Sequence, residues 1–506
     1  MKKLSLLVKM SESDNVAITT ADVLAGTELM EGLKANQDIP QSHKTALADI
    51  QKGEEIIRYG VVLGYAKDFI KKGDWIQEDM LDLPKPPSAE QMEFATNIHV
   101  KLPEPECLTF EGYENPDGGF AGTRNILGIS TTVQCVSGVL KVAVEKMKKE
   151  LLVKYPNVDD IVAIHHAYGC GVAINAPNAV IPIRILRNLA KHPNFGGQLM
   201  VVALGCEKLT VEQLIDKKDI ISENVIVLQE EKGFEAMINS LMKMAQKKLE
   251  ILNQRKRVTL PLSKLCIGMQ CGGSDAFSGV TANPAAGYAS DMLVSAGATV
   301  MFSEVTEVRD GVHYLAQRCV DEKVCEKLSS EMKWYDNYLA EGEVDRSANP
   351  TPGNKKGGLS NIVEKAMGSI SKSGTAPIVE VLSPGECPTK NGLIYAATPA
   401  SDIVCGPCQL ASGAVLEVFM TGRGTPYGLP IAPVIKVCSR NEMKDLWSDL
   451  IDINAGAIAV GEATIQDVGK EIFHKIIDVA SGRDECFAEK YNLWNDFCIF
   501  NPAPIT

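Results

Sequence analysis

The 506-residue chain has no long apolar run and no block of basic residues to offset its net charge of −13. A membrane-spanning helix needs about 20 consecutive apolar residues. The apolar stretch after Met1-Lys2-Lys3 ends at Lys9, which is too short for the core of a signal peptide. Nucleic acid binding depends on clustered Lys and Arg. We therefore expect a cytoplasmic protein with neither a membrane nor a nucleic acid as its partner.

A disulfide framework is not expected either, although fourteen cysteines are present. Thiols stay reduced in the cytoplasm, so these cysteines are interpreted as metal ligands or as small buried side chains. Cys405-Gly-Pro-Cys408 has the spacing of a thioredoxin-type pair. Such a pair belongs near the start of a compact domain, whereas this one lies deep inside a larger α/β region. We interpret it as incidental.

The character of the sequence changes along the chain. Residues 1–80 show short alternating strands with turns, which predicts a small β-rich domain. Residues 81–110 contain interspersed prolines and read as a semi-rigid linker. Residues 111–256 and 257–506 alternate buried-strand runs with helical stretches, which predicts a middle and a C-terminal α/β domain with a mainly parallel sheet. Strands are expected over 15–19, 45–50, 55–65, 160–164, 199–204, 225–228, 265–269, 299–302, 378–382, 393–396, 414–419, 434–436 and 457–460, and helices over 139–152 and 234–252.

Three predicted strands are each followed by a glycine-rich segment that carries a cysteine: Cys170, Cys206 and Cys271. In α/β sheets, ligands bind beyond the carboxyl ends of the strands, where glycine lets the backbone approach closely. Three converging thiolates would suit Fe²⁺ or Zn²⁺ and would leave positions open for substrate. The alternative is that each cysteine fills a small buried space.

Two further loops carry cations suited to carboxylates. Asn349–Gly358 offers Lys355 and Lys356, and Thr421–Gly428 offers Arg423, whose guanidinium can hold a carboxylate at two points. Neither loop matches a phosphate-binding P-loop or a dinucleotide fingerprint. A solvated turn before a helix is the alternative for the lysine loop. In the N-terminal region His43 is a candidate proton-transfer group, with a solvated surface histidine as its alternative.

Taken together, these segments resemble the altronate/galactarate dehydratase family over nearly the whole chain. The matching stretches include Tyr168-Gly169-Cys170-Gly171, Gly205-Cys206-Glu207, Met269–Asp275, Ser303–Val308, Asn354–Gly358 and Gly422–Gly428. Within the family, Tyr335–Leu339, Asp345–Pro350 and Phe500–Pro504 look like the galactarate branch rather than the altronate branch.

The resemblance implies a small N-terminal β-clip (SAF-like) domain, a middle domain used in dimerisation, a C-terminal Rossmann-like domain, and dependence on Fe²⁺. Its galactarate branch would eliminate water from galactarate, a sugar diacid, to give 5-dehydro-4-deoxy-D-glucarate. The reaction removes a proton α to a carboxylate and expels a β hydroxyl, so a cation must stabilise the charged intermediate. On this view His43 and His166 are candidates for proton transfer, and Lys355 and Arg423 orient the two carboxylates. Lys44, Asn354, Lys356 and Thr425, in or beside the matched segments, are expected substrate contacts.

Three other functions remain open at this point. An altronate dehydratase of the same family would act on a monoacid rather than a diacid. A sugar-acid binding protein would bind without turnover, and a redox protein would use Cys405 and Cys408.

Overall fold

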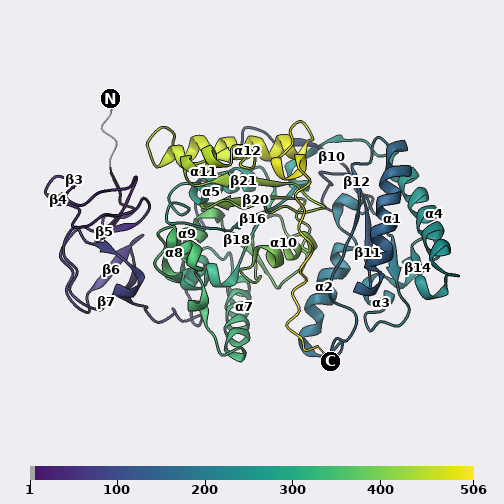
Figure 1. The fold of residues 1–506 in the computed structure, drawn as a ribbon, viewed down its shortest axis with the longest axis horizontal. Helices are drawn as coiled ribbons and strands as arrows, with labels where there is room; N and C mark the ends of the chain where they lie inside the picture. The colour runs from purple at the N-terminus through teal and green to yellow at the C-terminus, as the bar shows by residue number, and fades with distance from the viewer. Residues whose placement is uncertain (1–5, 506) are drawn as a thin grey trace.

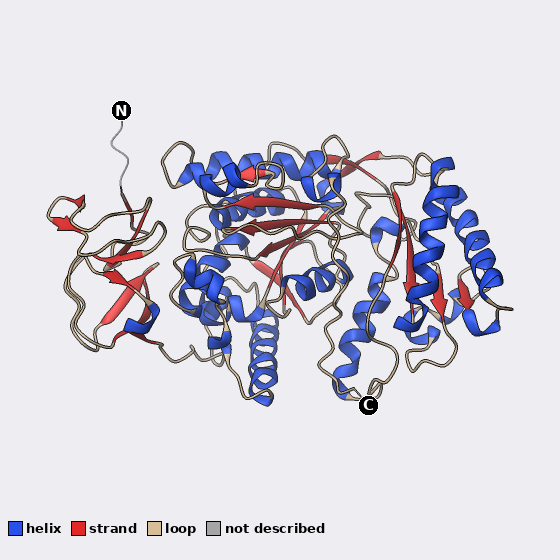
Figure 2. Ribbon diagram, in the orientation of Figure 1, coloured by secondary structure: helices blue, strands red, loops and turns tan. Residues whose placement is uncertain are grey.

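Three units lie in a row in the computed structural model, which describes residues 6–505 (Figure 1). An N-terminal β unit contacts one end of the C-terminal α/β unit, and a middle α/β unit lies at its other end (Figure 2). The predicted multidomain α/β fold with a small β-rich N-terminal unit is confirmed. No helix within residues 6–505 is both long and apolar enough to cross a membrane.

The N-terminal unit consists of short antiparallel strands. Its main sheet has the order β1-β2-β5-β8, and β6, β7 and β9 form a second sheet. The strands are β1 Leu7–Val8, β2 Val16–Thr19, β3 Glu28–Met30, β4 Leu33–Lys34, β5 Lys44–Ala46, β6 Glu55–Arg58, β7 Val61–Ala66, β8 Trp75–Ile76 and β9 Leu81–Asp82. Alternating small apolar side chains such as Val16, Ile56 and Leu63 form its core.

The proline-rich segment from residue 83 to 108 has no helix or strand but lies along the C-terminal unit. Arg346 donates a hydrogen bond to the carbonyl of Pro84, and Arg309 donates one to that of Pro87. The backbone N–H of Ala95 donates to the carbonyl of Cys319. The segment is therefore held at several points along its length.

The middle unit is a four-stranded parallel sheet in the order β12-β11-β13-β14. Its strands are β11 Ile126–Thr131, β12 Asp160–Ala163, β13 Val201–Ala203 and β14 Val225–Val227, and its helices are α1 Ser137–Glu150, α2 Val180–Leu189, α3 Val211–Leu214 and α4 Phe234–Leu252. An antiparallel ribbon of β10 (Thr109–Gly112) and β15 (Val258–Pro261) joins the start and end of this unit.

The C-terminal unit is built on a seven-stranded, fully parallel sheet in the order β18-β19-β17-β16-β20-β21-β22. Its central strands are buried along their whole length because helices cover both faces, as parallel sheets require. The strands are β16 Cys266–Cys271, β17 Thr299–Ser303, β18 Ile378–Leu382, β19 Gly392–Ala396, β20 Leu416–Thr421, β21 Val434–Cys438 and β22 Ile453–Asn454. The helices are α5 Ala282–Ser295, α6 Val312–Ala316, α7 Glu322–Glu341, α8 Pro352–Lys356, α9 Ile362–Ile370, α10 Asp402–Ala411, α11 Asn441–Leu446, α12 Ile465–Ala480 and α13 Phe487–Lys490.

Two sequence-based expectations need correction here. The last predicted strand, 457–460, is wrong: Gly456–Ile458 is a short 3-10 turn, and β22 lies just before it. The lysine loop is partly helical, because Thr351 caps the first turn of α8 and Pro352 occupies its first position.

The C-terminal tail ties the middle unit to the C-terminal unit, as the yellow trace in Figure 1 shows. Phe500 packs edge-on against Trp334 and Tyr338 of α7. Farther on, Ile505 pairs with Val172 in the middle unit.

Candidate functional site

The polar loops of the C-terminal unit gather where its central strands end, on the side that faces the N-terminal unit (Figure 1). Cys271 is the last residue of β16, and Glu304 follows β17 directly. Since β16 pairs with both β17 and β20, the loops after these three strands lie side by side. This is the edge at which parallel sheets bind ligands.

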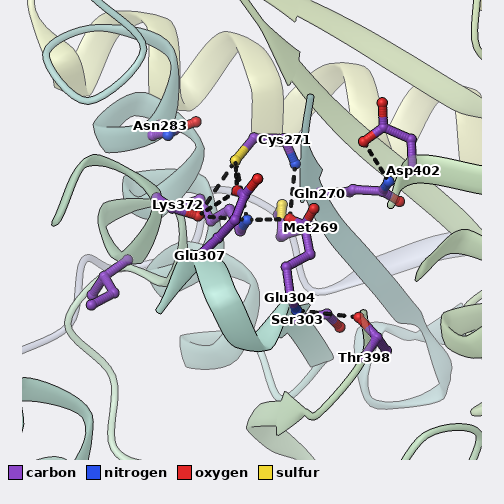
Figure 3. A network of polar contacts seen from close by, with 12 residues as sticks. Met269, Gln270, Cys271, Asn283, Ser303, Glu304, Glu307, Lys372, Thr398 and Asp402 are labelled. Atoms are coloured by element: carbon purple, nitrogen blue, oxygen red, sulfur yellow. Dashed lines mark hydrogen bonds and ion pairs between the residues drawn. The ribbon is translucent and has the colours of Figure 1, made fainter. Parts of the chain in front are cut away.

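A buried charged cluster occupies this edge (Figure 3). The Lys372 ammonium lies 2.7 Å from a Glu304 carboxylate oxygen and 3.2 Å from the Cys271 sulfur. The Lys365 ammonium lies 2.7 Å from Glu307, whose other oxygen is 3.2 Å from the Cys271 sulfur. Two ammoniums therefore balance two carboxylates inside the protein. We call Cys271, Glu304, Glu307, Lys365 and Lys372 the charged cluster.

Burial, together with the charges within this cluster, shifts the pKa values of its members. Burial, and then neighbouring Glu307, raises the pKa of Glu304 to about 8. Burial alone would raise the pKa of Glu307 too, but the Lys365 and Lys372 ammoniums outweigh it and lower that pKa. Burial raises the pKa of the Cys271 thiol to about 12, so the thiol is neutral near pH 7. The backbone of Glu304 has a φ of +80°, a strained conformation for a non-glycine residue.

The donor set of the cluster suits a divalent cation. The Cys271 sulfur and one oxygen each of Glu304 and Glu307 lie within 4.8 Å of one another. One Glu304 oxygen is buried with no hydrogen-bond partner among residues 6–505. A sulfur with two carboxylates matches a borderline metal such as Fe²⁺. Binding would require loss of the thiol proton and displacement of the Lys372 ammonium from the sulfur.

On the opposite face of β16, Gln270 points towards Asp402 at the start of α10 (Figure 3). The Gln270 amide lies 3.3 Å from the Asp402 carboxylate. Burial, followed by the charge of Glu307, raises the pKa of Asp402 to about 6. Burial and neighbouring Glu304 raise the pKa of Glu417, on β20, to about 8. Acidic side chains thus lie on both faces of the sheet edge.

Buried ionic contacts hold the N-terminal unit against this edge. Glu364 of α9 accepts from Lys44 at 2.9 Å and also contacts Arg58. Arg58 donates a second hydrogen bond, of 3.0 Å, to the carbonyl of Ala276. The hydroxyl of Ser42 donates to the carbonyl of Gly357 at 2.9 Å. These contacts fix the position of His43 relative to α8.

A cavity of 540 Å³ lies between the two units. His43 and Trp75 line it from the N-terminal unit, and Lys355 and Lys356 line it from α8. Lys355 forms an ion pair of 2.7 Å with Glu78. The hydroxyl of Ser360, also in the cavity wall, is buried and has no hydrogen-bond partner among the described residues. The cavity therefore combines cations with an unsatisfied polar group.

The loop after β16 separates α8 from the arginine loop. Cβ atoms added at Gly357 or Gly422 would come within 2.8 and 2.2 Å of the Asp275 side chain. Only glycine permits both loops to approach so closely. Arg423 is half-buried, and its side chain forms no ion pair within residues 6–505. Its guanidinium is available to a ligand.

The structure does not bring the three candidate metal-binding cysteines together. Cys170 and Cys206 are exposed in the loops after β12 and β13, in the sheet of the middle unit, whereas Cys271 is buried in the C-terminal sheet. Convergence fails because the strands concerned belong to two different sheets. Glu304 and Glu307, rather than Cys170 and Cys206, lie beside Cys271.

His166 also belongs to the middle unit. Its Nε2 lies 2.9 Å from the carbonyl of Thr131, and its Nδ1 accepts from the backbone N–H of Tyr168. The side chain is buried, and burial lowers its pKa. Both ring nitrogens already have partners, and the middle unit lies at the far end of the molecule from the unit that carries His43 (Figure 1).

The four expected substrate contacts have different environments. Lys44 is buried against Glu364 and is not among the residues that line the cavity, and burial together with Arg58 lowers its pKa. Asn354 is buried and donates to the carbonyl of Ser274, which makes it a support for α8. Thr425 accepts from the backbone N–H of Tyr427 within the arginine loop. Lys356 is exposed in the cavity wall.

Comparison with known proteins gives three matches to family models in chain order. They are the altronate/galactarate dehydratase SAF domain over residues 5–84, the second domain of D-galactarate dehydratase/altronate hydrolase over 112–253, and the C-terminal domain of D-galactarate/altronate dehydratase over 262–505. The chain belongs to the galactarate/altronate dehydratase family. The predicted family membership is confirmed.

Curated relatives cover from about three quarters to nearly all of the chain. Galactarate dehydratase (L-threo-forming) of Escherichia coli K12 is 56% identical over 99% of this chain and 97% of its own length. Altronate dehydratase of Bacillus subtilis 168 is 30% identical over 94% of this chain and 95% of its own. The β subunit of (2R)-sulfolactate sulfo-lyase from Chromohalobacter salexigens is 29% identical over 74% of this chain and 93% of its own.

Several residues of the site escaped the sequence analysis. Glu304 and Glu307 lie in the family-matched segment Ser303–Val308, and an acidic residue directly after a buried strand was the available signal. Lys365 and Lys372 lie on or after α9 and gave no such signal, since lysine is ordinary in a helix. Trp75 gave no signal in the sequence either, because its partner His43 is 32 residues away.

Proposed function

We propose that this family member dehydrates galactarate to 5-dehydro-4-deoxy-D-glucarate. The observation that carries the proposal is the 56% identity, over 99% of the chain, with galactarate dehydratase of Escherichia coli. At about 30% identity, altronate dehydratase of Bacillus subtilis is much more distant. An altronate-specific enzyme is the alternative.

The distribution of cations supports a diacid substrate. Lys355 and Lys356 line the cavity on one side of the loop after β16, and Arg423 lies on the other side of this loop with no ion pair among the described residues. A diacid needs a cation at each end, and the planar guanidinium suits a two-point contact. Arg423 would hold one carboxylate and the α8 lysines the other.

Cys271, Glu304 and Glu307 would hold a divalent ion, and we propose Fe²⁺. When bound, the ion would supply Lewis-acid stabilisation of the charge that develops at the carboxylate. The charged cluster is buried, and the cavity ends at His43, Ser360 and α8. We propose that α8 moves to admit substrate to the cluster, which would open the Lys355–Glu78 ion pair.

The test is anaerobic incubation of the reduced protein with Fe²⁺ and galactarate, with detection of the 2-keto product. Glucarate and altronate run in parallel. We expect product from galactarate and none from altronate at equal concentration. Product from altronate alone would establish the alternative, and binding of galactarate without turnover would indicate a sugar-acid binding protein.

Homodimerisation and a cytoplasmic location remain predictions. Size-exclusion chromatography with light scattering tests the first of these.

A further inference from the structure

Trp75 makes a specific contact with His43 inside the cavity. Its indole N–H donates to Nδ1 of His43 at 3.1 Å, and the two rings meet edge to face at 85° with centroids 5.1 Å apart. An indole N–H only donates, so Nδ1 must present its lone pair. The other ring nitrogen, Nε2, lies 3.3 Å from the carbonyl oxygen of Lys356, which only accepts. Both contacts are satisfied by one form of the ring, the neutral imidazole with its proton on Nε2.

Protonation of His43 would disrupt this arrangement. The imidazolium carries a proton on Nδ1, which would face the indole N–H, donor against donor. Burial lowers the pKa of His43, the hydrogen bond to the Lys356 backbone opposes this in part, nearby Lys44 lowers the pKa further, and Asp22 again opposes. The other charged groups around the cavity are Glu78 and Asp79 from the N-terminal unit and Lys355 and Lys356 from α8, so the two signs are balanced.

A ligand could replace the Lys356 carbonyl as the acceptor of the hydrogen bond from Nε2–H of His43. At 3.3 Å its contact with the Lys356 carbonyl is long for a hydrogen bond to oxygen. The hydroxyl of Ser360, 4% exposed, lines the same cavity without a partner. A ligand that brings an anionic oxygen would satisfy both groups and would lie beside the α8 lysines. A carboxylate has this chemistry.

We propose that Trp75 is a positioning residue that holds His43 as a neutral N–H donor to a substrate carboxylate. His43 then stabilises the negative charge that grows on this carboxylate when the α proton leaves, and it is not the base that removes this proton. A donor fixed in advance strengthens its bond as the charge develops. The inference rests on the proposed function only in taking the substrate to be a carboxylate.

The state of the ring is measured by NMR on the full-length protein with ¹⁵N-labelled histidine. The chain has seven histidines, and the spectrum of His43→Gln identifies the signals of His43. We expect wild-type His43 to show a protonated Nε2 and an unprotonated Nδ1, unchanged from about pH 6 to 8, although an ordinary histidine titrates near 6.5. In Trp75→Phe the ring should titrate. Trp494→Phe, a change at a half-exposed tryptophan elsewhere, should leave the His43 signals as in wild type.

Kinetics separate a donor from a base. Glutamine keeps an N–H donor but cannot take up a proton, so His43→Gln should retain kcat/KM within about tenfold of wild type, whereas His43→Ala should lose at least about a hundredfold. Trp75→Phe should lower kcat/KM because the ring is no longer held in place, while Trp494→Phe should follow wild type.

A wild-type ring with its proton on Nδ1, or one that titrates normally, overturns the inference. Equal loss of activity in His43→Gln and His43→Ala also overturns it, because the histidine then acts through its basicity. The NMR result does not depend on turnover. A wild-type protein that is inactive on galactarate but has the expected ring state contradicts the proposed function alone, and the kinetic comparison is then made with whichever sugar acid is turned over.

Discussion

At the scale of single residues, Cys271 belongs to two possible metal sites. The sequence grouped it with Cys170 and Cys206, whereas the structure places it beside Glu304 and Glu307. In both cases Cys271 is a ligand, so this residue alone does not separate them. The two possible sites are separated by Cys170 and Cys206, the exposed cysteines of the middle unit.

We expect Cys271→Ser to lose bound iron and at least about a hundredfold in turnover, because a serine hydroxyl is a poor Fe²⁺ ligand at neutral pH. Cys170→Ser and Cys206→Ser, at exposed positions, should keep both. Iron per chain and kcat are measured on anaerobic preparations, with circular dichroism to show that each variant is folded. Loss of iron from the Cys170 or Cys206 variant would instead support the hypothesis of a three-cysteine metal site.

Arg423 tests the class of substrate. Lysine keeps the charge but loses the two-point contact, which contributes about 2–3 kcal/mol. We therefore expect Arg423→Lys to lower kcat/KM by roughly 30- to 150-fold without lowering the melting temperature. If Arg423 only braces its loop, the melting temperature should fall and the kinetics of the folded protein should be unchanged.

At the scale of elements, α10 shows how a motif loses its usual meaning inside a fold. Cys405 and Cys408 are one helical turn apart, and both are buried where α10 packs on the sheet. Burial raises the pKa of Cys408 to about 12, and it also raises the pKa of Cys405 well above its ordinary value. Thiols in this state are not nucleophiles, since reactive cysteines need a lowered pKa and access to solvent.

Replacing both cysteines of α10 with alanine should keep turnover within a few-fold of wild type. Each change removes one buried sulfur, so the melting temperature should fall by a few degrees through lost packing. Turnover and thermal unfolding are measured on the same sample. A folded double variant that has lost several orders of magnitude in turnover would show that the pair takes part in the reaction.

At the scale of the whole molecule, the candidate site depends on two units staying together. Glu364 of α9 is fully buried and faces Lys44 and Arg58 of the N-terminal unit. The cavity that contains His43 exists only while this contact holds, because its walls come from both units. Removal of one partner from a buried ion pair leaves an uncompensated charge.

Glu364→Gln should therefore destabilise the contact between the units by about 3–5 kcal/mol. We expect faster proteolysis in the segment 83–108 and a fall in kcat/KM, since His43 would lose its place opposite α8. Asp478→Asn is the matched control, because Asp478 pairs with Arg483 at the surface and lies outside this segment. Surface pairs contribute little to stability. Equal behaviour of the two variants would show that the Glu364 contact is not what joins the units.

The order of strands and helices could be predicted from the sequence, because it depends on local patterns. The buried run 300–302 of β17 is apolar throughout, and the spacing of apolar residues in Phe234–Leu252 suits a helix. The glycine-rich segments after the strands also pointed to the edge of the C-terminal sheet at which the strands end, where Cys271 lies. The expected strand at 457–460 failed because a short apolar run fits a turn equally well.

Which residues meet was decided only by the tertiary structure. Sheet order differs from chain order, so β16 lies between β17 and β20, and Cys271 meets Glu304 and Glu307 rather than another cysteine. His43 and His166 look alike in sequence, yet they belong to separate units in which one ring lines a cavity and the other is fixed in a core. Contacts between distant segments depend on how whole sheets pack, and no local pattern records this packing.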